Sequence, residues 1–183
     1  LIASIIALRS DNLKRRLAYS TISQLSYVIL ATALLVPISI AGAVLHIVAH
    51  AFGKITLFFA AGSIYTATKK TEVSQLNGIG RSMPWTMLAF AIGSLSMIGI
   101  PPTAGFLSKW FILQGALDIQ SWFAVSVIVI STLLNTAYFL PIVYFAFFRD
   151  SGIKNEQRYN EAPFPIVFTV FSTACITVIL FFF

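Results

Sequence analysis

The stretch that decides the fold is PWTMLAFAIGSLSMIGIPPTAGFLSKWFILQGAL, residues 84–117. It is almost wholly apolar, and Pro101, Pro102 and Gly105 interrupt it near its middle. A helix needs about 20 mostly apolar residues to cross a bilayer, so this stretch is either two short crossings or one crossing by a broken helix. Unwound backbone is tolerated at membrane depth only where it is buried in protein or lines a hydrated cavity. The choice between the two therefore depends on the rest of the chain.

The composition around this stretch is that of an integral membrane protein. Of the 183 residues, 58% are hydrophobic and 10% are charged, and the mean hydropathy is +0.89. Soluble domains carry about 25% charged residues. Further apolar runs cover residues 17–36, 38–67, 121–148 and 163–183, after a stub at 1–8. We predict an all-α polytopic bundle with about five transmembrane spans. The chain begins and ends inside apolar runs, so we expect a single transmembrane domain over 1–183 that is part of a longer polypeptide.

The cations decide how often residues 84–117 cross the membrane. Lysine and arginine concentrate in three links: Arg9, Lys14, Arg15 and Arg16; Lys69, Lys70 and Arg81; and Arg149, Lys154 and Arg158. With one crossing, all three links fall on one face, as the excess of cations in cytoplasmic loops requires. With two crossings, the third link moves to the opposite face. We therefore predict one discontinuous helix, and the net charge of +6 needs no nucleic-acid partner.

Two cations, Lys54 and Lys109, lie inside apolar runs. A lysine near the bilayer centre costs about 2.5–3.5 kcal/mol on insertion scales, which favours a functional role. The alternative is that the side chain reaches a headgroup region. All six acids lie in links or at span ends, so we expect any ion-pair partner outside this chain. Lys109 also falls in the first turns of the second half-helix, where the positive end of the helix dipole disfavours an ammonium group.

His46 and His50 precede Lys54 at intervals of four residues. This spacing places the three side chains on one helical stripe, with neighbours about one turn apart. Groups so spaced can exchange protons through one bridging water, and imidazole is the side chain whose unperturbed pKa lies nearest physiological pH. Two other interpretations remain open, namely histidines that only hydrogen-bond to a neighbouring helix and histidines that bind a metal. Nothing nearby supplies the carboxylate or thiolate that commonly completes a metal site.

Other polar residues give weaker signals. Gln24, Ser108 and Asn135 lie within apolar runs and are candidates for lining a channel, although polar side chains also hold membrane helices together. The single cysteine, Cys175, excludes an internal disulfide and a multi-cysteine metal or iron–sulfur site. We find no phosphate loop, nucleotide fingerprint or nucleophile–base pair. The sequence therefore predicts no cofactor, no metal and no catalytic or redox site of its own.

Three ordered motifs resemble the antiporter-like subunits of respiratory complex I and of Mrp-type cation/proton antiporters. They are DNLKRRLAYSTISQ (11–24), HIVAHAFGK (46–54) and GIPPTAGFLSK (99–109). Within that superfamily the chain looks most like the D subunit of Mrp antiporters, through KRR at 14–16, IGRSMPW at 79–85 and EAP at 161–163.

The resemblance implies a fold with two inverted five-helix repeats, each containing a discontinuous helix. This chain would hold most of the second repeat, about 17–148, and the final helix, about 163–183. The roles carried over are a hydrophilic axis on His46, His50 and Lys54, connected to one membrane face by Lys109. The first repeat, with its own acid–lysine pair, would lie upstream.

The function that the resemblance implies is ion translocation in a multisubunit Na⁺/H⁺ antiporter. The alternatives are a proton-pumping subunit of an NADH:quinone oxidoreductase or related membrane-bound hydrogenase, and a structural scaffold subunit. In each case the partners would be other membrane subunits, the lipid bilayer, and H⁺ with or without Na⁺. We expect a multi-pass protein of the inner or plasma membrane of a prokaryote.

Overall fold

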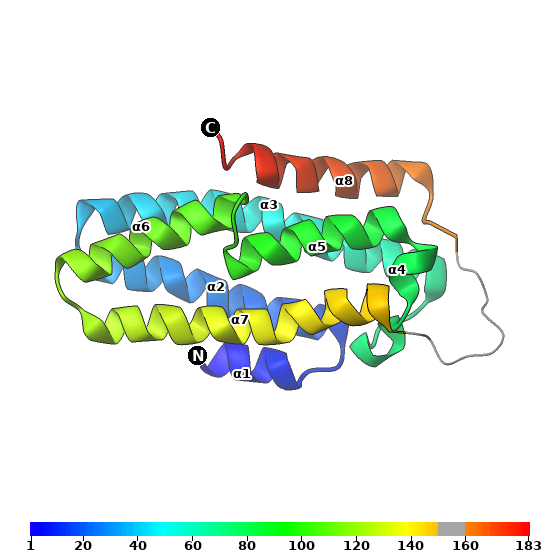
Figure 1. Ribbon diagram of the computed structural model, residues 1–183, viewed down its shortest axis with the longest axis horizontal. Helices are drawn as coiled ribbons and strands as arrows, with labels where there is room; N and C mark the ends of the chain where they lie inside the picture. The colour runs from blue at the N-terminus through cyan, green and yellow to red at the C-terminus, as the bar shows by residue number, and fades with distance from the viewer. Residues whose placement is uncertain (150–159) are drawn as a thin grey trace.

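The computed structural model describes residues 1–149 and 160–183 and shows a helical bundle (Figure 1). Two of the predicted link cations, Lys154 and Arg158, lie outside the described residues. The elements are α1 (Ile2–Arg9), α2 (Leu13–Ala33), α3 (Pro37–Thr68), the 3₁₀ helix η1 (Val73–Leu76), α4 (Ile79–Ser82), α5 (Pro84–Ile98), α6 (Ala104–Asp118), α7 (Trp122–Phe148) and α8 (Phe164–Ile179). By length and composition, α3 and α7 could each cross a membrane alone. The all-α prediction is confirmed.

The broken crossing is present as α5 followed by α6. Figure 1 shows the two half-helices continuing in the same direction through the bundle, joined by an unwound segment in the middle. α5 ends because Gly99 takes a left-handed conformation, with φ of 89°, which glycine adopts without a side-chain clash. Pro101 and Pro102, joined by a cis peptide bond, follow in the unwound segment. Residues 84–117 therefore form one discontinuous crossing, as the charge distribution predicted.

Small residues on α3 let the two half-helices pack closely against it. A side chain on Gly42 would meet the backbone nitrogen of Ile112 in α6 at 2.9 Å, and one on Gly53 would meet Met97 in α5 at 2.5 Å. Close helix approach through small residues is the usual way in which membrane helices associate. α3 thus forms the centre of the bundle and contacts α2, α5, α6 and α8.

The described links that carry cations meet at one end of the bundle (Figure 1). The backbone nitrogen of Leu13 donates to Thr71 (2.9 Å), and the backbone nitrogen of Val73 donates to Asp11 (2.7 Å). Gly78 in turn donates to the carbonyl of Phe145, near the end of α7. The links before α2, after α3 and after α7 are therefore neighbours, as one crossing by residues 84–117 requires.

Arg16 differs from the loop cation that the sequence suggested. α2 begins at Leu13 because the Asn12 side chain accepts a hydrogen bond from the backbone nitrogen of Arg15 and caps the helix. Arg16 therefore lies in the first turn of α2 and is buried. Its guanidinium donates to the carbonyls of Ser10 (2.8 Å) and Tyr138 (3.2 Å), joining α1, α2 and α7.

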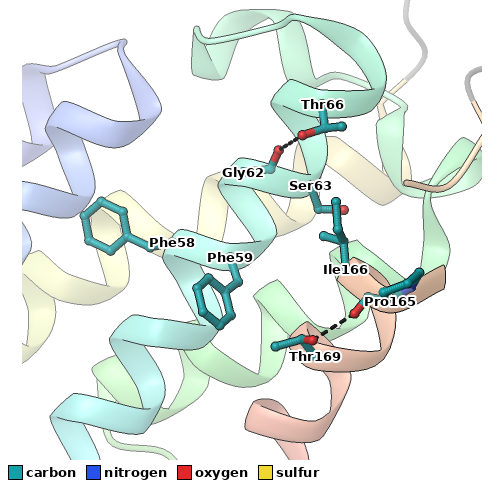
Figure 2. A pocket seen from close by; sticks show the side chains of 8 residues that line it. All are labelled: Phe58, Phe59, Gly62, Ser63, Thr66, Pro165, Ile166 and Thr169. Carbon is teal, nitrogen blue, oxygen red and sulfur yellow. Dashed lines mark hydrogen bonds between the residues drawn. The ribbon is translucent and has the colours of Figure 1, made fainter. Parts of the chain in front are cut away.

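A cavity of about 430 Å³ lies between α3 and α8 (Figure 2). Its polar side chains are already paired: Thr66 donates to Gly62, Thr169 donates to Pro165, and Ser63 shares a hydrogen bond with Thr86. The cavity therefore presents a mainly apolar surface. It shares no lining residue with the polar residues predicted from the sequence.

Glu161, just before α8, caps the first turn of α5. Its carboxylate accepts hydrogen bonds from the backbone nitrogens of Trp85 (2.8 Å) and Thr86 (3.3 Å) and from the Thr86 hydroxyl (2.6 Å). A carboxylate at a helix N-terminus satisfies orphan N–H groups and complements the helix dipole. Glu161 therefore links the start of the last helix to the broken one.

Glu161→Gln should lower the free energy of unfolding by about 1 kcal/mol, since the amide loses the negative charge and one of its two acceptor oxygens. The measurement is thermal unfolding of the full-length protein in detergent. Asp118→Asn is the matched control because Asp118 ends α6, where a carboxylate gains nothing from the helix dipole. Equal destabilisation by the two substitutions would contradict the capping role.

Candidate functional site

His46, His50 and Lys54 lie on a buried face of α3 and expose 1%, 8% and 6% of their surface. The two imidazole rings are stacked, with centroids 6.3 Å apart. Imidazole Nε2 of each histidine is buried and has no hydrogen-bond partner within the described part of the protein. The stripe thus carries titratable groups through the centre of the bundle.

Lys54 is held at one end of this stripe by α2. Its Nζ donates to the carbonyl of Leu17 at 3.0 Å and to the hydroxyl of Ser20. It also lies 5.7 Å from the centre of the Phe139 ring on α7. An ammonium group is therefore satisfied here by neutral oxygens and an aromatic face rather than by a carboxylate.

His46 connects the stripe to α6 through Ser108. The Ser108 hydroxyl donates to the carbonyl of Gly105 at 3.0 Å and lies 2.9 Å from Nδ1 of His46. A hydroxyl has a single proton, so with that proton directed to Gly105 we assign Nδ1 of His46 as the donor in the second hydrogen bond. This assignment leaves Nε2 of the neutral ring unprotonated and able to accept a proton.

Lys109 extends back across the helix break. Its Nζ donates to the carbonyls of Met97 (2.7 Å) and Ile98 (3.0 Å), the last two residues of α5. The expectation that Lys109 lies in the unfavourable field of the α6 N-terminus is wrong for the charged atom. The side chain is long enough to place its ammonium at the C-terminus of α5, where the helix dipole favours a positive charge.

Gln24 and Asn135 occupy different surroundings. Gln24, fully buried on α2, donates from Nε2 to the Met97 carbonyl that Lys109 also contacts (3.0 Å). Asn135, fully buried on α7, accepts a hydrogen bond from the Tyr138 hydroxyl. The structure therefore brings Gln24, Lys109 and the His46–Ser108 pair together at the break. Asn135 accepts from Tyr138 on its own helix through Oδ1, and its Nδ2 is buried without a hydrogen-bond partner among the described residues.

Sequence reasoning missed Tyr27. Its ring centre lies 4.9 Å from Nζ of Lys109, and its ring centroid lies 5.5 Å from that of His46. Tyr27 thus lies between the α3 stripe and the break. It could have been found, because Ser20, Gln24 and Tyr27 follow the i, i+4, i+7 spacing of one helical face.

The four acids within the described ranges lie in links or at a helix end: Asp11, Glu72, Asp118 and Glu161. Within the same ranges, no group of three histidine, cysteine or acidic side chains is placed to hold a metal ion. The site is thus built from two lysines, two histidines, hydroxyls, amides and backbone carbonyls.

Comparison with known proteins places this arrangement in a family. Residues 1–135 match the family model described as "NADH:quinone oxidoreductase/Mrp antiporter, TM". The chain belongs to this family. It is therefore an antiporter-like membrane chain, and the membrane fold predicted from the composition is confirmed.

The antiporter-like chain is similar in sequence to a respiratory-chain subunit and similar in fold to subunits of two solved complexes. It is 40% identical over 165 residues to NADH-quinone oxidoreductase subunit N of Desulforudis audaxviator, covering 90% of this chain and 32% of that protein. A subunit of the Mrp complex of a Dietzia species shares its fold, with a TM-score of 0.89, 21% identity, and coverage of 100% of this chain and 42% of the other. A subunit of respiratory complex I from Thermus thermophilus does so with a TM-score of 0.86, 21% identity, and coverage of 97% and 37%. The antiporter-like chain spans about a third of the length of subunit N. The related structures are subunits of multisubunit complexes.

Proposed function

We propose that this chain carries protons through the membrane part of a larger complex along the line formed by Lys54, His50, His46 and Lys109. The observation that carries the proposal is the set of buried titratable groups on α3 and α6, with no carboxylate among them. Ionisable groups inside a membrane are costly and usually mark an ion path.

The order of the groups suggests how a proton would move. Lys54 and His50 are separated by one helical turn, as are His50 and His46, so one water can bridge each pair. The unprotonated Nε2 of His46 can receive a proton, and Tyr27 and Ser108 lie between that ring and Lys109. Like charges interact strongly in a medium of low dielectric constant. A charge that arrives at one member of the line therefore disfavours a charge on the next.

We further propose that the complex is a Mrp-type Na⁺/H⁺ antiporter of the prokaryotic cell membrane, in which this chain belongs to a D-type subunit. The motifs at 79–85 and 161–163 support the D-type assignment, and the structural likeness to a Mrp subunit is compatible with it. The second candidate is a proton-pumping subunit of an NADH:quinone oxidoreductase, which the 40% identity to subunit N favours. Either complex would supply the partner subunits.

The experiment that separates the two candidates is a flux measurement on the purified full-length complex in proteoliposomes. A sodium gradient is applied without NADH, and a pH-sensitive dye reports proton movement. An antiporter is expected to move protons in response to sodium alone. Proton movement that requires NADH and a quinone would reject the antiporter and support the respiratory complex.

His50→Leu tests the proton line against a purely structural role. Nε2 of His50 has no partner among the described residues, so leucine should fit without breaking a hydrogen bond at that atom. We expect proton flux to fall about a hundredfold, the lower end for a positioned proton-transfer group, with assembly unchanged. A scaffold role predicts the reverse pattern of poor assembly and unchanged flux per assembled complex. Thr169→Val, which alters a hydroxyl between α3 and α8, should leave flux unchanged.

A further inference from the structure

The C-terminus of α5 presents two carbonyls that the helix itself does not use. The last four carbonyls of a helix have no intrahelical donor. Here the backbone nitrogens of Gly99 and Ile100 cap Leu95, whereas the carbonyls of Met97 and Ile98 accept hydrogen bonds from Nζ of Lys109. These two oxygens carry part of the negative end of the α5 dipole. They lie at the helix break, within the bundle.

The surroundings of these carbonyls supply further oxygen and no formal negative charge. Gln24 donates to Met97 through Nε2, and the Oε1 atom of the same amide is buried without a hydrogen-bond partner among the described residues. The Tyr27 ring lies 4.9 Å from the ammonium nitrogen, and aromatic faces attract cations. Divalent cations in proteins usually bind through carboxylates, whereas Na⁺ binds to unwound carbonyls and half-helix C-termini. The group therefore suits a monovalent cation.

We propose that the carbonyls of Met97 and Ile98 form a monovalent cation site in which the Lys109 ammonium takes the place of a free ion. The amide oxygen of Gln24, to which the ammonium makes no hydrogen bond, completes the site when an ion replaces the lysine. Lys109 is then a tethered cation, and a sodium ion and the lysine head group exclude one another at this site. The inference deepens the proposed antiporter function and rests on it for its biological meaning. It would give the complex a place where sodium and a charged lysine compete.

A cavity lies beside the Lys109 side chain. A cavity of about 300 Å³ is lined by Lys109 itself and by Gly99, Trp110 and Thr132, among other residues of α5, α6 and α7. Gly99 also makes room for the lysine stem, because a Cβ there would lie 2.9 Å from Cδ of Lys109. The Lys109 side chain therefore borders a volume that its head group would enter when an ion takes its place.

The other groups that the structure describes around Lys109 include no negatively charged side chain that would attract a cation away from the two carbonyls. α2 presents Tyr27 and α3 presents His46, whose Nδ1 is committed to Ser108. α7 contributes Thr132 and apolar side chains to the cavity. Of the titratable side chains that face Lys109 from α2, α3 and α7, none is a carboxylate, so the cation is attracted chiefly by dipoles.

The test is sodium binding to the purified full-length complex in detergent, measured by equilibrium dialysis with radioactive sodium at one fixed pH. Lys109→Met removes the tethered charge and keeps most of the side-chain volume. We expect sodium to bind about tenfold more tightly than to the unaltered complex, as for a site that the lysine leaves free about a tenth of the time. Lys109→Arg keeps a cation and should show no gain. Lys109→Gln provides a second neutral variant if Lys109→Met fails to assemble.

Two further variants assign any gain to this site. Adding Gln24→Leu to Lys109→Met should abolish the gain, because the amide oxygen is lost. Lys54→Met also removes a buried lysine, but Nζ of Lys54 contacts one carbonyl and one hydroxyl rather than two carbonyls at a helix end. Lys54→Met should therefore give no gain in sodium affinity. An assembled Lys109→Met or Lys109→Gln complex that binds no more sodium, or an equal gain in Lys54→Met, would overturn the proposal. If the unaltered complex shows sodium-driven proton flux and the Lys109 variants show no gain in sodium binding, only the site is rejected. A gain in sodium binding by the variants, with no sodium-driven flux in the unaltered complex, rejects only antiport.

Discussion

Gly105→Ala should destabilise the protein by about 3 kcal/mol, the upper end of the usual cost of overpacking. The added Cβ would lie 1.9 Å from the carbonyl oxygen and 2.8 Å from the carbonyl carbon of Ser96. Both are backbone atoms, so no side-chain rotation relieves the clash. The half-helices α5 and α6 would have to separate, which would disturb the hydrogen bonds that Lys109 makes across the break. The measurement is thermal unfolding of the full-length protein in detergent.

Gly62→Ala is the control. Gly62 lies in α3 beside the cavity of Figure 2, and an added Cβ there meets no atom within 4 Å. Alanine in the middle of a helix is favoured over glycine by about 0.5–1 kcal/mol. Gly62→Ala should therefore raise the melting temperature, whereas Gly105→Ala should lower it. Similar small changes in the melting temperature of both variants would show that α5 and α6 are packed less closely at Ser96 than these distances imply.

Lys54→Met should reduce proton transport about a hundredfold, a loss typical of removing a positioned proton-transfer group. The substitution should not harm folding. The Leu17 carbonyl that loses Lys54 still accepts hydrogen bonds from the hydroxyls of Ser20 and Thr21. Methionine also fills most of the volume of the lysine stem. The measurement is dye-monitored proton flux in proteoliposomes, normalised to the amount of assembled complex.

Lys14→Met is the matched control for this experiment. Lys14 is an exposed cation at the end of the bundle where the cationic links meet, and its Nζ lies 5.0 Å from the centre of the Tyr65 ring. Its removal changes the net charge by the same amount without touching the buried line. Transport that survives Lys54→Met, or falls equally in Lys14→Met, would reject Lys54 as a proton carrier.

Much of the fold was predictable because its causes are local in the chain. Runs of apolar residues set the helices, and Gly99, Pro101 and Pro102 set the place where one of them breaks. The grouping of cations in three links then indicated that residues 84–117 cross the membrane once. The side of the membrane on which a link lies depends only on the number of crossings that precede it in the chain. The start of α2 was placed too late, because the cap formed by Asn12 extends the helix beyond the apolar run.

The site was predicted in part. The spacing of His46, His50 and Lys54 is a property of one helix, so periodicity alone places them on one face. Tyr27 was missed because aromatic residues are common in apolar runs, and only the packing of α2 against α3 and α6 brings it to His46 and Lys109.

The sequence by itself determined that this is a bundle of membrane helices with one broken crossing and two buried lysines. Hydropathy and backbone-breaking residues act over a few neighbouring positions, so they can be read without coordinates. Only the tertiary structure decided what those lysines contact. A lysine side chain spans several ångströms, so Lys109 begins at the positive end of α6 yet places its charge at the negative end of α5. Arg16 turns inward to carbonyls of two other helices for the same reason. Such contacts depend on distances between helices, which are fixed only when the bundle packs.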